Sequence, residues 1–151
     1  MLVWYKNDIA SPMVTKEILL IEPCMHSNYL ARIITKNDKF YTTHSPVTII
    51  DKMCLANGSS LAGRLSGSRH ILGIKRLPPL FIGGTPVFAI QLKMSQEKTL
   101  YLFTLDFKTY PAAEKGSYLE LDDNGYRVYV KASLATIARK CLEVGYLMLK
   151  L

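Results

Sequence analysis

Short runs rich in β-branched and aromatic residues recur along almost the whole chain, and they constrain the fold more than any other feature. Each run is four to seven residues long and is bounded by turn residues, which is typical of strands. The predicted strands are residues 2–5, 17–21, 30–35, 39–43, 47–51, 70–75, 87–92, 99–105, 118–121 and 126–131. The pattern therefore predicts a fold dominated by sheet.

The connections between these runs indicate how the strands pair. The segments KND (36–38), KMSQEK (93–98) and DDNG (122–125) have the length and the residue types of hairpin turns. We therefore expect the strands on either side of each segment to be antiparallel. Pro78 and Pro79 have no N–H group and push the residue before each out of the helical region, so they predict a rigid corner.

One strong helix signal lies near the end of the sequence, at residues 133–145. Ser133 suits the N-cap and Gly145 suits the C′ position. Apolar residues repeat between them with helical spacing, at Leu134, Ile137, Ala138, Cys141 and Leu142. The following segment YLMLKL either returns to the core or projects toward a partner. We predict a single α+β domain over residues 1–151: predominantly antiparallel sheet, as hairpins or a partly open barrel, with a C-terminal amphipathic helix.

Composition excludes several classes of protein. The apolar runs are far shorter than the roughly 20 residues that a membrane span needs, and the first residues, MLVWYKND, do not resemble a secretion signal. The three cysteines, Cys24, Cys54 and Cys141, form no C-x-x-C pair, and the three histidines are scattered. We therefore expect a cytoplasmic protein with reduced thiols, no metal and no cofactor.

The positive charge is concentrated in the middle of the chain. Residues 31–98 hold ten Lys and Arg against three Asp and Glu, which accounts for the whole net charge of +7. No acidic residue lies between Asp51 and Glu97. Such a field attracts polyanions, of which nucleic acid is the commonest in a cell. A membrane surface would call for an amphipathic helix with a basic face, which this section lacks. An ordinary solvated basic face is the remaining alternative.

The segment GSSLAGRLSGS (58–68) lies in the middle of this basic section. Glycine and serine let a backbone approach a phosphate closely, but they also make up ordinary turn-rich connections between strands. The spacing of Gly58, Gly63 and Arg64 is close to that of a P-loop. However, Arg64 stands where the lysine belongs, and Leu65 replaces the required hydroxyl residue. Ser60 lacks the surroundings of a hydrolase nucleophile. Taken alone, the segment therefore favours a turn-rich connection between two strands, and we expect no enzyme.

The stretch IIDKMCLANGSSLAGRLSGS, followed ten residues after Ser68 by Pro78 and Pro79, resembles the signature region of the ComK family of bacterial competence transcription factors. Thirteen positions fit that signature without a gap: Asp51, Lys52, Cys54, Gly58, Ser59, Ser60, Ala62, Gly63, Arg64, Gly67, Ser68, Pro78 and Pro79. The resemblance is strong over residues 30–82 and extends more loosely to about residue 142.

This resemblance implies a self-associating activator in the cytoplasm, at the nucleoid, that binds paired A/T-rich boxes of double-stranded DNA largely through the minor groove. Arginine on a closely approaching loop suits such a groove. We assign Arg64 and Arg69 to contact with the groove or with phosphate. Phosphate is positioned by Ser59, Ser60 and the Gly63 N–H. The salt-dependent part of the binding free energy comes from Lys52, Lys75 and Arg76. We expect Arg64→Ala to weaken duplex binding with little loss of stability.

Two further expectations complete the interpretation. Asp51 and Cys54 fit the signature, but capping and core packing suit their chemistry better than DNA contact. The chain is shorter than typical family members, and we expect it to lack most of the C-terminal segment implicated in self-association. In the family, a short apolar motif in that segment engages a protease adaptor, to which residues 146–150 have a faint likeness. The alternative is a ComK-fold protein-interaction or regulatory domain without effective DNA binding.

Overall fold

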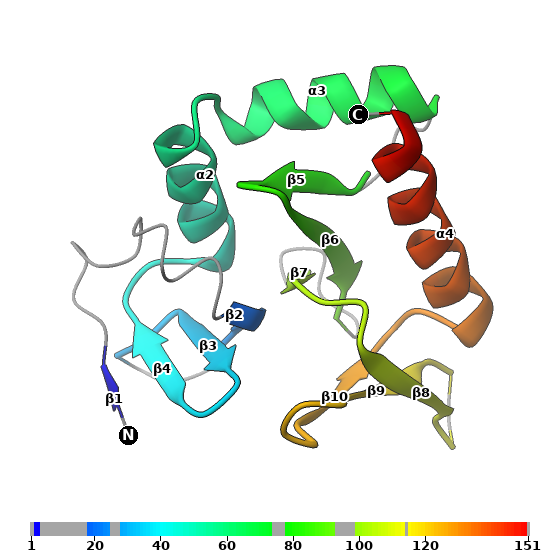
Figure 1. Ribbon diagram of the computed structural model, residues 1–151. Helices are drawn as coiled ribbons and strands as arrows, with labels where there is room; N and C mark the ends of the chain where they lie inside the picture. The colour runs from blue at the N-terminus through cyan, green and yellow to red at the C-terminus, as the bar shows by residue number, and fades with distance from the viewer. Residues whose placement is uncertain are drawn as a thin grey trace.

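Two sheets and three helices make up the part of the chain that the computed structural model describes, namely residues 2–3, 18–24, 28–73, 78–92, 99–113 and 115–150 (Figure 1). The strands are mostly antiparallel and the last helix, α4, ends the described chain, which confirms the predicted α+β class. No helix among these residues is long and apolar enough to cross a membrane.

The larger sheet has seven strands in the order β1-β4-β3-β2-β7-β6-β5. Its strands are β1 (Leu2–Val3), β2 (Ile18–Pro23), β3 (Ala31–Thr35), β4 (Lys39–Thr42), β5 (Leu80–Ile82), β6 (Thr85–Gln91) and β7 (Thr99–Leu102). All neighbours are antiparallel except β1 and β4, which are parallel. The sheet is open, with β1 and β5 at its edges, so the barrel version of the prediction is not realised.

The smaller sheet has three antiparallel strands, β8 (Phe107–Pro111), β9 (Ser117–Leu121) and β10 (Arg127–Val130). The predicted hairpins at 36–38 and 122–125 are confirmed, since they join β3 to β4 and β9 to β10. The segment 93–98 lies outside the described residues, and the strands on either side of it, β6 and β7, are antiparallel as expected.

Residues 47–51 form a helix, so the prediction of a strand there is wrong. They belong to α2 (Pro46–Ala56), which begins after Ser45; the side chain of this N-cap accepts a hydrogen bond from the Thr48 N–H at 3.3 Å. Proline at the first helical position suits a helix start as well. The β-branched run that resembled a strand supplies the inner face of this helix, because Ile49 and Ile50 are fully buried.

The predicted loop at 58–68 and the predicted strand at 70–75 are also wrong. Residues of both belong to α3 (Leu61–Leu72), which Ser60 caps and which ends at Gly73 in the left-handed region at φ 70°. Residues 74–77 lie outside the described part. Helix α4 (Leu134–Lys150) begins after Ser133 as expected, but it continues through Gly145 to Lys150. Leu147 of the tail segment is buried, so part of that tail belongs to the core.

The larger sheet is covered on both faces. Adjacent residues of a strand point to opposite faces, and Ile21 of β2 belongs to a cluster with α2 and α3 whereas Leu20 belongs to a cluster with the small sheet and α4. In β3, Ile33 and Ile34 divide between the two clusters in the same way. Two apolar cores therefore hold helices α2 and α3 on one face of the sheet and α4 on the other.

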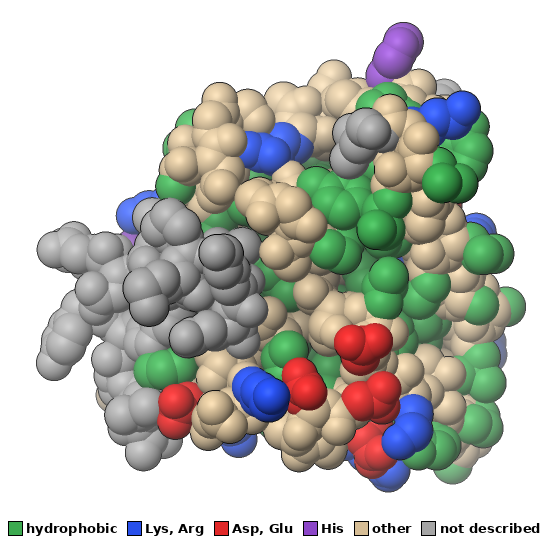
Figure 2. All heavy atoms as spheres, viewed as in Figure 1, with side chains coloured by type: hydrophobic (Ala, Val, Ile, Leu, Met, Phe, Trp, Pro, Cys, Tyr) green, Lys and Arg blue, Asp and Glu red, His purple; other side chains and the backbone are tan. Residues whose placement is uncertain are grey.

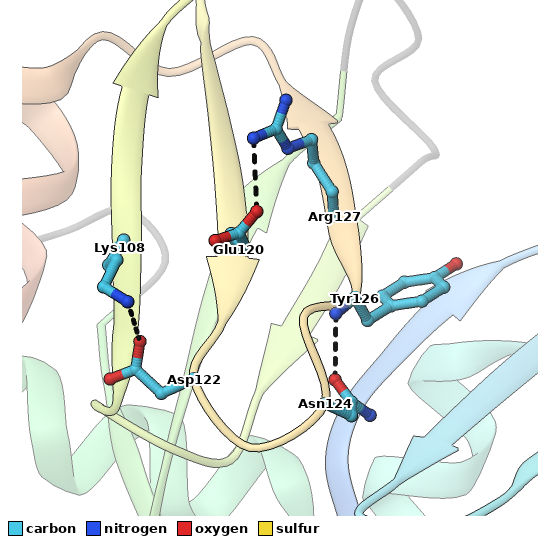
Figure 3. A network of polar contacts seen from close by, with 6 residues as sticks. All are labelled: Lys108, Glu120, Asp122, Asn124, Tyr126 and Arg127. Carbon is cyan, nitrogen blue, oxygen red and sulfur yellow. Dashed lines mark hydrogen bonds and ion pairs between the residues drawn. The ribbon is translucent and has the colours of Figure 1, made fainter.

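A buried polar contact joins the two sheets. Glu22 of β2 is only 5% exposed, and its Oε2 accepts hydrogen bonds from the Arg32 Nε at 3.2 Å and from the Tyr126 hydroxyl. In the same hairpin, Asn124 donates from Nδ2 to the Thr35 carbonyl at 3.1 Å and accepts from the Tyr126 N–H at 2.9 Å (Figure 3). These contacts fix the β9–β10 hairpin against β2 and β3.

Stability is expected to fall above about pH 10, where an unfolded tyrosine ionises. Burial, the hydrogen bond to Glu22 and the charge of that carboxylate all raise the pKa of Tyr126. A group whose pKa is raised in the folded state contributes stability that is fully present below its pKa in the unfolded state. That stability is lost as the pH rises through the pKa of the folded state. Urea unfolding measures the free energy of unfolding between about pH 8 and 11, a range that spans the pKa of an unfolded tyrosine. Tyr126→Phe should flatten the decline, and an equal slope in both proteins would contradict the assignment.

Candidate nucleic-acid interface

Helices α2 and α3 form a helix-turn-helix pair. Residues 57–60 join them, and Gly58 lies in the turn at φ 105°, a backbone conformation that other residues rarely adopt. Two helices joined by a short turn with glycine are a common DNA-binding arrangement. In Figure 1, α3 runs along the top of the molecule, with α2 below its first turn and α4 beside its last. The segment expected to be a loop is thus the second helix of this pair.

The start of α3 is capped by the protein itself. The Leu61 N–H donates to Asp51 Oδ1 at 3.0 Å, and the Gly63 N–H donates to Ser60 Oγ at 3.0 Å. The capping role of Asp51 is confirmed. The buried side chain of Cys54 confirms its packing role; burial raises the pKa of this thiol, with Arg64 lowering it and Asp51 raising it further. Ser60 and the Gly63 N–H, both assigned to phosphate, therefore already have partners within the fold.

The Arg64 side chain ties the end of α2 to β5. Its Nη1 donates to the Phe81 carbonyl at 2.7 Å, and its Nη2 donates to the Asn57 carbonyl at 2.7 Å and to the Cys54 carbonyl at 3.3 Å. Its Nε is buried without a hydrogen-bond partner among the described residues. A cation at the C-terminal end of a helix also interacts favourably with the helix dipole. The guanidinium thus has a structural role that sequence reasoning missed.

Three small residues and one histidine occupy the face of α3 that points away from the core. Gly63, Ser66, Gly67 and His70 are all exposed and follow the i, i+3, i+4, i+7 spacing of one helix face; we call them the outer stripe. A Cβ on Gly67 would meet nothing within 4 Å, so packing within the chain does not require a glycine there. Arg69 is exposed beside the stripe. The stripe leaves the α3 backbone accessible to a large ligand.

Charge distinguishes α3 from the opposite end of the molecule. The helix carries no acidic residue. Figure 2 shows the acidic side chains of this face in its lower half, and none near α3 at the top. On the small sheet, Arg127 pairs with Glu120 at 3.1 Å and Lys108 with Asp122 at 3.7 Å (Figure 3). A polyanion approaching α3 thus meets no carboxylate on that helix.

The remaining predicted residues are only partly brought together. Ser59 is exposed in the turn before α3, whereas Lys52 is half-buried on α2. Lys75 and Arg76 lie outside the described residues. The DNA contacts assigned to all eight residues stay predictions. Sequence reasoning did not identify Ser66 and His70 as part of the outer face of a helix. The available signal for that helix was a capping serine followed by helical spacing.

Comparison with known proteins identifies the family of this chain. The chain matches the family described as ComK protein over residues 9–99, which is more than half of its length. The chain belongs to the ComK family. The matched region includes α2, the turn and α3, whereas the small sheet and α4 lie outside it.

One curated relative is similar over a shorter stretch. The competence transcription factor of Bacillus subtilis (strain 168) is 36% identical over 52 residues. That stretch covers 34% of this chain and 27% of the relative's own length. No solved structure gave a significant match. Of the thirteen signature positions of this chain, three lie on α2, five lie on α3 and three lie in the turn between them, and the last two are Pro78 and Pro79.

Proposed function

We propose that this chain is a competence-type transcription regulator that binds A/T-rich double-stranded DNA and contacts it with the turn and helix α3. The carrying observation is that helix α3, the second helix of a helix-turn-helix pair, has no acidic residue and carries the small residues Gly63, Ser66 and Gly67 on its outer stripe. Family membership and a relative named as a competence transcription factor support the same function. The proposal includes no catalytic step.

The dimensions of DNA restrict how α3 would bind. A helix with its side chains is about 10–12 Å across, whereas the minor groove of B-DNA is about 6 Å wide. Helix α3 would therefore lie over the phosphates, where the small side chains of the outer stripe permit close approach. From there the exposed Arg69 side chain would enter the narrow A/T minor groove, whose negative potential attracts arginine. Ser59 would contact phosphate from the turn.

Arg69→Ala is expected to weaken binding to an A/T-boxed duplex by about 5- to 150-fold, the effect typical of a lost groove contact. The slope of log K against log salt should also fall by about 1 if the contact includes phosphate. Fluorescence anisotropy at several salt concentrations measures both values. Arg127→Ala on the small sheet is the matched control and should change neither. Equal losses of affinity in the two variants would show that Arg69 does not contact the DNA.

A charge series at Ser66 tests whether the outer stripe faces DNA. Ser66→Lys should tighten duplex binding, Ser66→Gln should weaken it moderately by bulk alone, and Ser66→Glu should weaken it most, because a carboxylate would face phosphate. Ser66 is exposed, so all three variants should fold normally. Anisotropy titrations at one salt concentration provide the comparison. Identical affinities for the three variants would place the DNA elsewhere.

The groove assignment has its own test. A minor-groove ligand such as distamycin should displace the protein from an A/T-boxed duplex. If the ligand leaves binding unchanged, the minor-groove part of the proposal fails. Insertion of α3 into the major groove, which admits a helix, would then replace it.

The proposal extends to the family's implied behaviour in the cell. It includes self-association as an activator, action in the cytoplasm at the nucleoid, and contact of the segment 146–150 with a protease adaptor. A second function is a ComK-fold interaction domain without effective DNA binding. The internal partners of Arg64, Ser60 and the Gly63 N–H favour that alternative. Salt-dependent duplex binding would exclude it, and no binding to any duplex would establish it over the regulator.

A further inference from the structure

Helix α4 has two apolar faces, and only one of them packs against the rest of the described chain. The inner face buries Ile137, Val144 and Leu147. The opposite face is exposed over its whole length. Its residues, which we call the α4 seam, are Ala135, Ala138, Leu142, Gly145 and Leu149. A surface helix of a globular protein normally has one apolar stripe, so this second one calls for a partner.

The exposure of the α4 seam is large. Leu142 is 74% exposed and Leu149 is 84% exposed, the highest values among the exposed large hydrophobic side chains of the described chain. Tyr146 beside them is 48% exposed and Met148 is 52% exposed. Figure 2 shows apolar side chains along the right-hand edge of the molecule, where α4 lies in Figure 1.

The spacing of the α4 seam is that of a coiled coil. Successive members are three, four, three and four residues apart, which is the alternation of the a and d positions. Leu142 and Leu149 share one of these positions, and Ala138 and Gly145 share the other. From Ala138 to Leu149, small and large residues therefore alternate along the seam.

We propose that the α4 seam pairs antiparallel with the α4 seam of a second copy of this chain. In an antiparallel pair, a positions face d positions. Leu142 then lies opposite Gly145 of the second copy, and Leu149 lies opposite Ala138 of the second copy. Each layer combines one leucine with one small residue, as close packing requires. A parallel pair would set leucine against leucine and glycine against glycine, leaving gaps at the small layers.

The side chains flanking the α4 seam are complementary in the same orientation. Arg139 would lie opposite Tyr146 of the second copy, and symmetry repeats this contact at the other end. An arginine over a tyrosine ring is a favourable cation–π pair. The Tyr146 ring already accepts a cation within the chain, because the Lys150 Nζ lies 5.3 Å from its centroid. The side-chain volumes of the seam and the flanking cation–π contact thus both favour a second copy as the occupant.

The α4 seam is also continuous with the proposed DNA-binding unit. Leu72 of the last turn of α3 lines a surface hollow of about 810 Å³ together with Leu142, Tyr146 and Leu149. Pairing of two α4 helices over this hollow would bring two α3 helices into one assembly. The inference therefore deepens the proposed function by naming the surface for self-association, although the pairing itself needs no DNA.

Sedimentation velocity without DNA tests the pairing. A single pair of short helices gives a small interface, and small interfaces are weak, so protein concentrations should span roughly 1 to 200 µM. The full chain is expected to shift from monomer to dimer over this range. Leu142→Arg should remain monomeric with an unchanged unfolding temperature. Leu30→Arg is the matched control, since Leu30 is 54% exposed on another surface, and it should dimerise normally.

Gly145→Leu tests the orientation. Gly145 has open space around its Cα, and leucine forms helix better than glycine, so this variant should unfold at a higher temperature. In the antiparallel pair the new side chain would occupy the space of Leu142 from the second copy, and dimerisation should be lost. Stronger dimerisation would overturn the antiparallel arrangement, because a parallel pair has a gap there to fill.

Other outcomes separate this inference from the proposed function. A wild-type chain that stays monomeric throughout, or an unchanged dimer in Leu142→Arg, would overturn pairing through the α4 seam, whatever the DNA titrations give. A dimer that Leu142→Arg abolishes would support the pairing even if no duplex binds.

Discussion

Replacing Arg64 by alanine is expected to destabilise the fold by about 3 kcal/mol or more, because hydrogen bonds from a charged donor contribute about 1.5–3 kcal/mol each and their loss leaves acceptors unpaired. The Phe81 carbonyl at β5 and the Asn57 and Cys54 carbonyls at the end of α2 would all lose this donor. The earlier expectation of little stability loss assumed that Arg64 lies in a loop. In the structure Arg64 belongs to helix α3, so that assumption is wrong.

Urea unfolding of three variants tests the structural role of Arg64, because it measures stability without DNA. Arg64→Ala should unfold at much lower urea than the wild type. Arg64→Lys should recover only part of the loss, since a single ammonium group does not reproduce the planar fork of a guanidinium. Arg69→Ala, on the exposed side of the same helix, should change the free energy of unfolding by no more than about 0.5 kcal/mol. An unchanged midpoint in Arg64→Ala would refute the structural role.

Glu22→Ala is expected to cost about 1.5–3 kcal/mol, the usual effect of losing hydrogen bonds to a charged group, because the Arg32 side chain is 28% exposed and can regain water. Arg32 would lose its carboxylate, and the Tyr126 hydroxyl would lose its acceptor. Burial lowers the pKa of Arg32, but the charge and hydrogen bond of Glu22 outweigh this effect and raise it overall. The β9–β10 hairpin should therefore loosen from β2 and β3.

Native-state hydrogen exchange together with urea unfolding measures this effect. In Glu22→Ala, amides of the β9–β10 hairpin should exchange faster than in the wild type, and Glu22→Gln should lie between the two because it retains an acceptor. Asp122→Ala is a suitable control, since its ion pair with Lys108 is exposed and contributes little. Equal stability in Glu22→Ala and Asp122→Ala would contradict the role of the buried contact.

Sequence alone predicted most of the sheet because the signals for its strands are local. The two confirmed hairpins follow from turn chemistry at 36–38 and 122–125, and β9 beside the second one alternates buried and partly buried residues. The start of α4 is local as well, since Ser133 caps it. Its end was misplaced because Gly145 is a helical residue here rather than a terminator.

The two signature helices were missed because their composition conceals them. Four consecutive β-branched residues at 47–50 favour a strand, but packing against the sheet overrides that preference. Helix α3 contains two glycines and two serines, which are poor helix formers, and it folds onto β5 and α4. Capping serines at 45 and 60 preceded both helices and carried the overlooked signal.

The candidate site was predictable in location but not in the roles of its residues. Charge distribution and the signature both pointed to the segment that became α3. The role of Arg64 depends on carbonyl groups at Phe81 and Asn57, whose positions are set by how β5 and α2 pack rather than by neighbouring sequence. A charged residue in a glycine-rich stretch therefore cannot be assigned to a ligand until its tertiary partners are known.

The position of β2 in the larger sheet sets the order in which the chain can fold during synthesis. Ile21 pairs on one side with Ile33, 12 residues later, and on the other side with Tyr101, 80 residues later. At typical elongation rates this interval lasts roughly 4 to 16 s. Throughout that time one edge of β2 has no native partner, while α2 and α3 are being made. The nascent chain thus carries an open strand edge that is prone to mispairing until β7 emerges from the ribosome.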